Sequence, residues 1–221
     1  MSVRKIHLGK LLKAFYLPEA PRRSFLRADI RSEIQKESGT DLAGGDFHLP
    51  FWTDAKNHVR GLLDLKEKSK LRIESNKGRE RLYPQLTRGF LNWWNEKRRW
   101  RNEDFEFIKE DVYARFPLPE VDGIVKIENL LALRIGDQTN RIIYPYFTEE
   151  PNLKFEGARI GLWIMNQALK GYALNDLRIL DILRERSFAT RDYPLVGNER
   201  VLFTQKYQSL VREWDKLRQE Y

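Results

Sequence analysis

The chain has 221 residues, with 40 Lys and Arg against 32 Asp and Glu, 3 His and no Cys. Its length suits one large domain or a domain with a helical extension, and 41% hydrophobic residues suffice for a core, which argues against global disorder. The absence of Cys excludes a disulfide framework, thiol catalysis and thiolate metal sites. No stretch approaches the roughly 18 uninterrupted apolar residues of a membrane span, so we expect no membrane-spanning helix. We expect the protein to be cytoplasmic and bacterial.

The positive charge is concentrated in one part of the chain. Residues 1–110 hold 24 basic and 16 acidic side chains, whereas residues 111–221 hold 16 of each. Within 56–101 the excess is larger still, with 14 basic side chains against 5 acidic ones. A local excess of this kind attracts polyanions, whereas the same charge spread thinly over a surface does not.

The first half is predicted to be helical. Apolar residues at 3–4 residue spacing predict an amphipathic helix within 1–17 and another over 25–37, followed by a Gly-containing loop over 39–50. A further helix is expected from Thr53 or Asp54, either of which can cap it, to about residue 75, with Val59, Leu62, Leu63 and Leu65 inward. The next helix is expected over 85–102, where Leu86, Phe90, Trp93, Lys97 and Trp100 share one stripe.

The second half alternates between strands and helices. The β-branched run 123–135 and the run 141–147 flank turn residues and predict a hairpin, in which Pro145 marks an end, a bulge or an edge. A buried helix is expected over 154–169, a strand over 177–183 with a short helix as its rival, and a last helix over 199–219. The sequence therefore predicts an α+β fold whose C-terminal half is α/β-like. Its parts are a mainly helical basic region over 1–110 and a core over 111–221, unless the two form one continuous domain.

The segments IVKIENLLAL, IIYPYFTEEPNL, FEGARIGLWIM, RILDILRERSF and SLVREWDKL carry a resemblance over roughly residues 120–221. Their order resembles the core of PD-(D/E)XK nucleases and of a bacterial protein family with a similar core. In active nucleases of this class, an acidic residue before the hairpin and an E-x-K on the returning strand hold Mg²⁺, which polarises the phosphate and activates water. Here the returning strand has neither Glu nor Lys, and Glu128 is the single carboxylate near the other position. The resemblance therefore implies an inactive relative.

A nuclease with displaced ligands is the catalytic alternative, and only this alternative requires a cofactor, Mg²⁺. Its ligands would be drawn from Asp122, Glu128 and Asp181. The structural interpretation of the same residues is that Asp122 shapes a turn with Gly123 and that the others are surface or paired carboxylates. The three histidines, His7, His48 and His58, are too scattered in sequence to predict a metal site.

The most informative segment is WWNEKRRWR over residues 93–101. Nucleic-acid binding needs cations for phosphates and flat faces for bases, and this segment offers both at helical spacing. Trp93 and Trp100 share a face and are expected in the core, whereas Trp94 is the expected exposed stacking platform. A second basic run follows Lys66, Lys68, Lys70, Arg72, Lys77, Arg79 and Arg81. The alternative is that both runs are solvated faces.

The sequence thus favours a non-catalytic nucleic-acid-binding protein, without distinguishing DNA from RNA. The expected contact residues are Arg79, Arg81, Arg88, Trp94, Lys97, Arg98, Arg99 and Arg101. Besides the nuclease, the alternative from another class is an adaptor whose basic surface meets an acidic protein or a second copy of the chain. Its 12 Phe, 9 Tyr and 6 Trp supply anchors for such an interface.

Overall fold

The computed structural model describes residues 2–39, 46–100, 102–108, 111–136 and 139–221. These residues form seven α-helices and eight strands, which confirms the predicted α+β fold. The helices are α1 (Leu8–Tyr16), α2 (Glu19–Glu37), α3 (Leu49–Val59), α4 (Leu65–Ser75), α5 (Tyr83–Asn92), α6 (Phe155–Ala168) and α7 (Glu199–Arg218). The strands are β1 (Lys5–His7), β2 (Phe105–Phe107), β3 (Ala114–Leu118), β4 (Gly123–Ile127), β5 (Leu131–Ile135), β6 (Thr139–Tyr146), β7 (Leu177–Asp181) and β8 (Arg186–Phe188). Short helical turns are η1 (Lys77–Arg79), η2 (Trp93–Lys97), η3 (Pro119–Val121) and η4 (Leu174–Asp176).

The strands form two mixed sheets. The larger sheet has the order β2-β5-β6-β7-β8, in which β6 and β7 are parallel and the other neighbours antiparallel. The smaller sheet has the order β1-β4-β3, with β1 parallel to β4. Since β5 pairs with β6 from Leu131 opposite Ile143 to Ile135 opposite Thr139, the predicted hairpin is confirmed. Pro145 lies beyond the last of these pairs, so β6 is a local edge there on the β5 side, as expected for a residue without an N–H.

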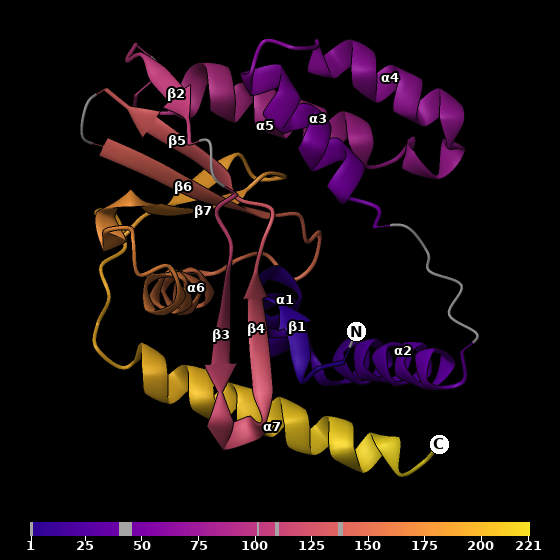
Figure 1. Ribbon diagram of the computed structural model, residues 1–221. Coiled ribbons are helices and arrows are strands. Elements are labelled where there is room, and N and C mark those ends of the chain that lie inside the picture. The colour runs from indigo at the N-terminus through magenta and orange to yellow at the C-terminus, as the bar shows by residue number, and fades with distance from the viewer. Residues whose placement is uncertain (1, 40–45, 101, 109–110, 137–138) are drawn as a thin grey trace.

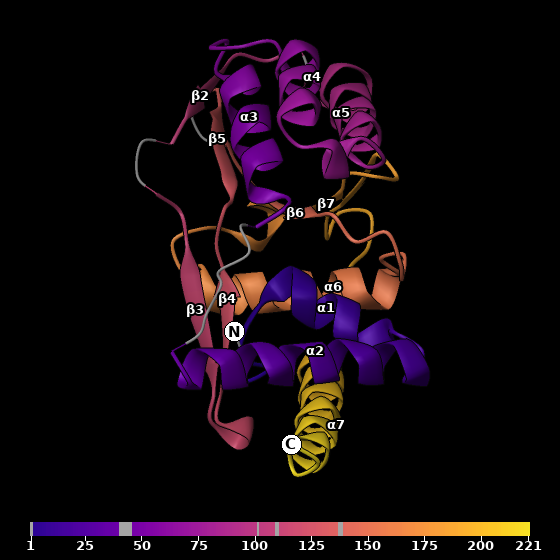
Figure 2. The ribbon, with the colours of Figure 1, turned by 90° about the vertical axis from the view of Figure 1, so that its right-hand side faces the viewer.

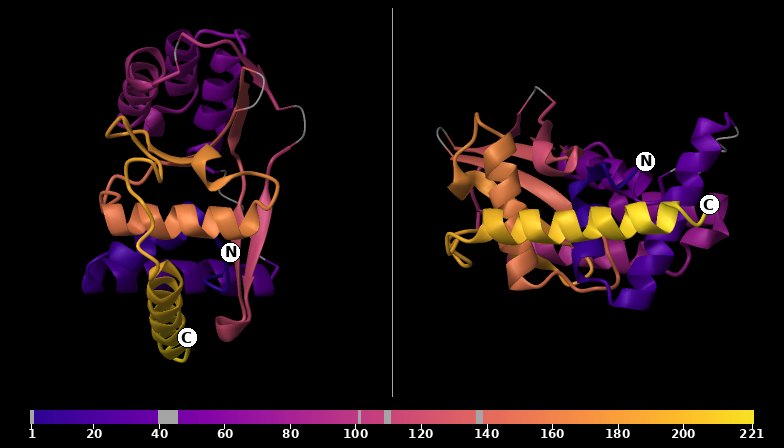
Figure 3. Two further views of the ribbon diagram at one scale, coloured as in Figure 1. Left: turned by 90° about the vertical axis from the view of Figure 1, so that its left-hand side faces the viewer. Right: turned by 90° about the horizontal axis from the view of Figure 1, so that it is seen from below.

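Helices cover both faces of the five-stranded sheet (Figure 1). One apolar cluster joins α3 and α5 to one face of β5, β6 and β7. The other cluster joins α1, α2, α6 and α7 to the opposite face and to the smaller sheet. Figure 2 shows α2 and α6 lying across the view while α7 is seen end-on, and α7 contacts both of them. In Figure 3 the β3–β4 ribbon passes the end of α6 and reaches α7.

Residues of 1–110 and of 111–221 pack together in both clusters. The first cluster contains Leu8 and Ile30 as well as Phe203, and the second contains Phe90 as well as Leu133. A division near residue 110 stays a prediction, but this packing favours one continuous domain. None of the described helices combines the length and the apolar character needed to cross a bilayer.

The N-terminal segment is tied to the C-terminal helix α7. The Tyr207 hydroxyl donates to the Val3 carbonyl at 2.7 Å, and Arg4 donates to the Asp215 carboxylate at 2.8 Å. The indole N–H of Trp214 donates to Asp29 at 3.1 Å. These contacts enclose β1 and α1 between α7 and the rest of the fold.

The predicted helix over residues 53–75 is wrong, because the chain breaks at Gly61. That residue has φ of 72°, and the Leu62 N–H donates back to the Asn57 carbonyl at 3.0 Å, which ends α3. Leu62 is consequently 70% exposed, in contrast to its predicted inward position. Neither Thr53 nor Asp54 is an N-terminal cap, because α3 begins earlier, at Leu49. The Asp46 carboxylate instead accepts from the N–H groups of His48 and Leu49 at the start of α3.

The run 123–135 was expected to be one strand and is instead two, in different sheets. Asn129 has φ of 62°, a conformation that Asn tolerates better than most residues, and its carbonyl accepts from the Trp52 indole. The chain therefore leaves β4 in the smaller sheet and enters β5 in the larger one. The other elements predicted for this half, 154–169, 177–183 and 199–219, are confirmed as α6, β7 and α7.

Candidate functional site: an arginine-lined pocket

Basic side chains gather at one pocket of about 390 Å³, which we call the arginine pocket. It is bounded by η2 and the residues after it, by β6 and β7, and by β8 with the segment that follows. Among its described lining residues, seven are basic and three are acidic. The basic ones are Lys97, Arg98, Arg99, Arg141, Arg178, Arg186 and Arg191, and the acidic ones are Glu103, Glu185 and Asp192. This surplus makes the pocket the best candidate for an anion site.

Strand register places two of these arginines side by side. Ile143 of β6 pairs with Arg178 of β7, and Arg141 precedes Ile143 by two residues, so all three side chains point to one face of the sheet. Farther along β7, Leu180 continues the same face and is buried with Ile143 in the second cluster. The two half-buried arginines therefore lie where this apolar face ends.

A π-helical turn brings Arg98 to the same place. The predicted helix over 85–102 ends early, because α5 passes into η2 and the Arg98 N–H donates to the Trp93 carbonyl, five residues back, at 2.9 Å. The Arg98 backbone is then extended, and its guanidinium turns back over the aromatic cluster. The guanidinium carbon lies 3.6 Å from the centre of the Trp94 ring and 4.8 Å from that of Trp100. This stacking fixes the guanidinium plane.

Backbone carbonyls hold the other two guanidinium groups. Arg141 donates to the Asn140 carbonyl at 2.7 Å. Arg178 donates to the carbonyls of Asn175 and Leu177, at 2.6 and 2.7 Å. These acceptors are neutral, so they orient the side chains without cancelling their charge.

Most of the positive charge in the pocket lacks an anionic partner among the described residues. Lys97 pairs with Glu185, and Arg99 pairs with Asp192. Within the described part of the chain, none of the remaining five basic groups has a carboxylate oxygen within 4.0 Å; they are Arg98, Arg141, Arg178, Arg186 and Arg191.

Arg186 borders the pocket, but its guanidinium points away from it. Arg186 pairs with Asp181 of β7, on the face opposite Arg178, and its guanidinium stacks 4.6 Å from the centre of the Phe155 ring and donates to the Tyr193 hydroxyl at 2.7 Å. Four basic groups of the pocket are therefore left without a carboxylate partner among the described residues: Arg98, Arg141, Arg178 and Arg191.

Burial adds to the electrostatic cost of this arrangement. Desolvation, followed by the charge of Arg141, lowers the pKa of Arg178 to about 10. Desolvation also lowers the pKa of Arg98 and of Arg141. The Nε atoms of Arg98 and Arg141 are buried and have no hydrogen-bond partner among the described residues. An anion in the pocket would offset part of this cost by supplying negative charge.

The predicted contact residues divide between the pocket and other places. Lys97, Arg98 and Arg99 line the pocket, and Arg88 is exposed on α5, where its charge still acts on Glu185. Arg81 instead pairs with Glu149, and Arg79 stacks on Tyr83 and donates to the Arg72 carbonyl. Arg101 lies outside the described residues.

The prediction that Trp94 is exposed is wrong. Trp94 is 7% exposed because Phe90, Trp93, Trp100 and Phe105 surround its ring, and Arg98 covers one face. Trp93 and Trp100 are buried, as expected. Trp93 and Trp100 therefore form part of the pocket wall, and none of the three tryptophans has an exposed ring face on which a base could stack.

Sequence reasoning missed the four arginines that come from the second half: Arg141, Arg178, Arg186 and Arg191. A signal for two of them was present. Arg141 begins the run RIIYPYF and Arg178 interrupts the run LRILDIL, and both occupy positions that face a covered side of the sheet. A charged residue at such a position needs a partner, which makes it a candidate binding residue.

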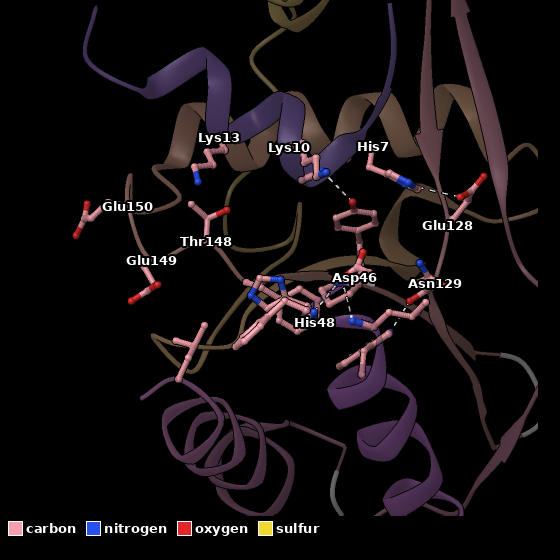
Figure 4. Close-up of a pocket in the computed structure, with 18 of the residues that line it drawn as sticks. His7, Lys10, Lys13, Asp46, His48, Glu128, Asn129, Thr148, Glu149 and Glu150 are labelled. Carbon is pink, nitrogen blue, oxygen red and sulfur yellow. Dashed lines mark hydrogen bonds and ion pairs between the residues drawn. The ribbon is translucent and has the colours of Figure 1, made fainter. Parts of the chain in front are cut away.

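A second cleft, of about 650 Å³, lies where β6 ends, between the starts of α1 and α3. In Figure 4, Lys10 and Lys13 lie on the α1 wall, His48 lies on the opposite wall, and His7 and Glu128 point toward each other. His7 Nδ1 is 3.7 Å from Glu128 Oε2. The charged side chains of this cleft nearly balance, with three basic residues (Lys10, Lys13 and Arg81) against four acidic ones (Asp46, Glu128, Glu149 and Glu150). The second cleft therefore has no positive surplus comparable to that of the arginine pocket.

Two of the three histidines, scattered in the sequence, meet at this second cleft. The His48 ring stacks on Phe147 with centroids 4.8 Å apart, and desolvation lowers the pKa of both His7 and His48. His58 lies elsewhere, beside the Leu63 carbonyl. Across the described residues, no group of three or more His, Asp and Glu side chains is placed to hold a metal ion.

The structure does not bring the three candidate nuclease carboxylates together. Asp122 precedes β4 and Glu128 follows it, so the length of a strand separates them, about 20 Å at 3.3 Å per residue. Asp122 has φ of 47° and forms the turn before Gly123, as the structural interpretation expected. Asp181 is buried at the end of β7, 3.6 Å from Arg184, and desolvation raises its pKa. The proposed ligand set is therefore not a single site.

Comparison of the chain with models of known protein families, with curated proteins and with solved structures gives no match.

Proposed function

We propose that this protein is a non-catalytic nucleic-acid-binding protein that seats phosphate in the arginine pocket. The observation that carries the proposal is a pocket lined by four basic side chains, Arg98, Arg141, Arg178 and Arg191, that have no carboxylate partner among the described residues. Guanidinium groups match phosphate oxygens in geometry and charge, and half-buried ones bind more strongly than fully solvated ones.

The surroundings of the pocket favour a polyanion over an isolated small anion. The part of the basic segment 56–101 that lies beside the pocket is η2 with Arg88 of α5. A chain with repeated phosphates can contact the pocket and this flanking surface at the same time, whereas a single anion can contact only the pocket.

Phosphate contacts without base stacking imply little sequence preference. Trp93, Trp94 and Trp100 are each less than 10% exposed, so their faces are not free for bases. Contacts to the phosphate backbone position a nucleic acid but do not read its sequence. We therefore expect binding with weak sequence preference and strong salt dependence.

A salt titration with labelled single- and double-stranded DNA and RNA, followed by fluorescence anisotropy, tests this function. Three proteins are compared: wild type, Arg99→Gln/Arg191→Gln and Lys66→Gln/Lys70→Gln. Each variant loses two positive charges, but only the first loses them from the pocket, and all four positions are exposed, so folding is spared. Lys66 and Lys70 lie on α4, outside the pocket.

The pocket variant is expected to bind about tenfold more weakly or worse, and its salt slope for single strands is expected to fall by about 1.4. The α4 variant should bind within about twofold of wild type. Equal losses in both variants would mean that net charge alone drives binding. Absence of binding by wild type would refute the function and move the adaptor alternative to first place.

A further inference from the structure

The shape of the arginine pocket restricts which phosphate it can hold. The sheet forms its floor, while η2 and the segment after β8 form walls on either side. Its volume of about 390 Å³ lies at the lower end of the range for small-molecule sites, roughly 300–1,000 Å³. A space of this size fits one phosphate with its sugar. A continuous strand would need a groove open at both ends.

The charge of the pocket also favours a single, highly charged phosphate over an internal phosphate of a continuous strand. An internal phosphodiester carries one negative charge, whereas a terminal phosphate monoester carries about 1.5–2 at pH 7 and presents three oxygens. Four basic groups without carboxylate partners in the described chain, Arg98, Arg141, Arg178 and Arg191, are more than one phosphodiester neutralises. Of the three carboxylates that line the pocket, Glu185 and Asp192 are already paired with Lys97 and Arg99, and Glu103 acts on Arg141 from beyond ion-pair distance.

The arginines are held before any ligand arrives. Arg98 is stacked on two indole rings, and Arg141 and Arg178 are held by backbone carbonyls. Holding donors in place lowers the entropy lost on binding and favours a ligand that can use several of them at once.

We infer that the arginine pocket binds the terminal phosphate of a nucleic-acid strand, so that the protein recognises phosphorylated ends. This inference rests on the proposed nucleic-acid binding and specifies the part of the strand that is bound. Both 5′ and 3′ ends carry the same phosphate chemistry, and the test includes an arm for each.

The experiment measures anisotropy with one labelled 12-nucleotide strand in three forms: with a 5′-phosphate, with a 3′-phosphate and with hydroxyls at both ends. The label is attached to an internal base, which leaves both ends free. Wild type is compared with Arg141→Gln/Arg178→Gln, with the exposed pair Arg99→Gln/Arg191→Gln and with the control Lys66→Gln/Lys70→Gln. The exposed pair keeps the test valid if the half-buried pair does not fold, which circular dichroism shows.

Wild type and the α4 control are expected to bind one phosphorylated form about tenfold more tightly than the hydroxyl form, and both pocket variants are expected to lose this preference. Equal binding of the three forms would overturn the inference and leave the proposed function standing. A preference that persists in both pocket variants would also overturn it, because the end would then bind elsewhere. Failure to bind any form would instead refute the proposed function itself.

Discussion

The guanidinium carbon of Arg98 lies 3.6 Å from the centre of the Trp94 ring. Two residues expected to contact nucleic acid separately thus contact each other. The tryptophan serves as a support that orients the cation, and the π-helical turn η2 makes this arrangement possible because it places Arg98 beyond the end of the helix. Recognition here therefore depends on an aromatic cluster that a ligand need not touch.

Arg98→Lys tests this support directly. Lysine keeps the positive charge but lacks the flat guanidinium that stacks on Trp94 and Trp100. We expect oligonucleotide binding to weaken several-fold and the free energy of unfolding to fall by about 0.5–2 kcal/mol. Anisotropy and urea unfolding followed by tryptophan fluorescence measure the two effects. Arg88→Lys is the control on exposed α5, and identical behaviour of the two variants would show that only charge matters.

The preference for a terminal phosphate should grow between pH 5 and pH 8. A phosphate monoester takes its second charge with a pKa of about 6. The groups that line the pocket are its seven basic residues with Glu103, Glu185 and Asp192, and no histidine is among its described lining residues. Lys97 lowers the pKa of Glu185, and that of Arg178 is about 10, so both stay charged throughout this interval. The ratio of affinities for phosphorylated and hydroxyl ends, measured against pH, checks this. A flat ratio would contradict the dianion argument.

The ion pair between Asp54 and Arg72 is expected to stabilise the packing of α3 against α4. Asp54 is 3% exposed, and Arg72 donates to its two oxygens at 2.8 and 3.1 Å. Asp54→Ala leaves a partly buried cation without its partner and should lower the free energy of unfolding by about 2–3 kcal/mol. Glu220→Ala removes the exposed partner of Arg27 and should cost less than about 0.5 kcal/mol. Chemical denaturation compares them, and equal costs would contradict the role of burial.

Gly89 should tolerate no side chain, although it lies in a helix. A Cβ at this position would lie 2.1 Å from the Ile182 carbonyl oxygen, where α5 crosses the end of β7. Alanine ordinarily stabilises a helix relative to glycine by about 1 kcal/mol, but here overpacking should cost about 1–3 kcal/mol. Gly171→Ala serves as the control, because no atom of the described residues lies within 4 Å of a Cβ built at that position. A stable Gly89→Ala protein in thermal unfolding would show that α5 and β7 can separate.

The spacing of apolar residues, together with the Gly, Pro and turn residues between segments, predicted the helices and strands that are long and regularly patterned. In these elements the apolar pattern repeats several times, so that one residue that departs from it does not change the prediction. Examples are the helices α2, α6 and α7 and the strands β6 and β7. Breaks inside such runs were missed. Gly61 and Asn129 each adopt a positive φ, and neither residue type alone indicates whether a run stops there or continues.

The candidate site was predicted only in part, for a related reason. The local charge excess indicated Lys97, Arg98 and Arg99, because these residues are neighbours in sequence. Arg141 and Arg178 join them through the pairing of β6 with β7, a long-range register that the sequence does not display. The burial of Trp94 depends likewise on Phe105 of β2, a strand that the pattern did not predict.

The contacts that join Val3 to Tyr207 and Arg4 to Asp215 constrain the order in which the molecule can assemble. The first pair is separated by 204 residues, so its loop closes only after almost the entire described chain has been synthesised. Until α7 leaves the ribosome, β1 and the apolar face of α1 lack their final neighbours. The residues of β1 are therefore synthesised well before the helix that packs against them, and native-like protection of their backbone should arise only once α7 has left the ribosome.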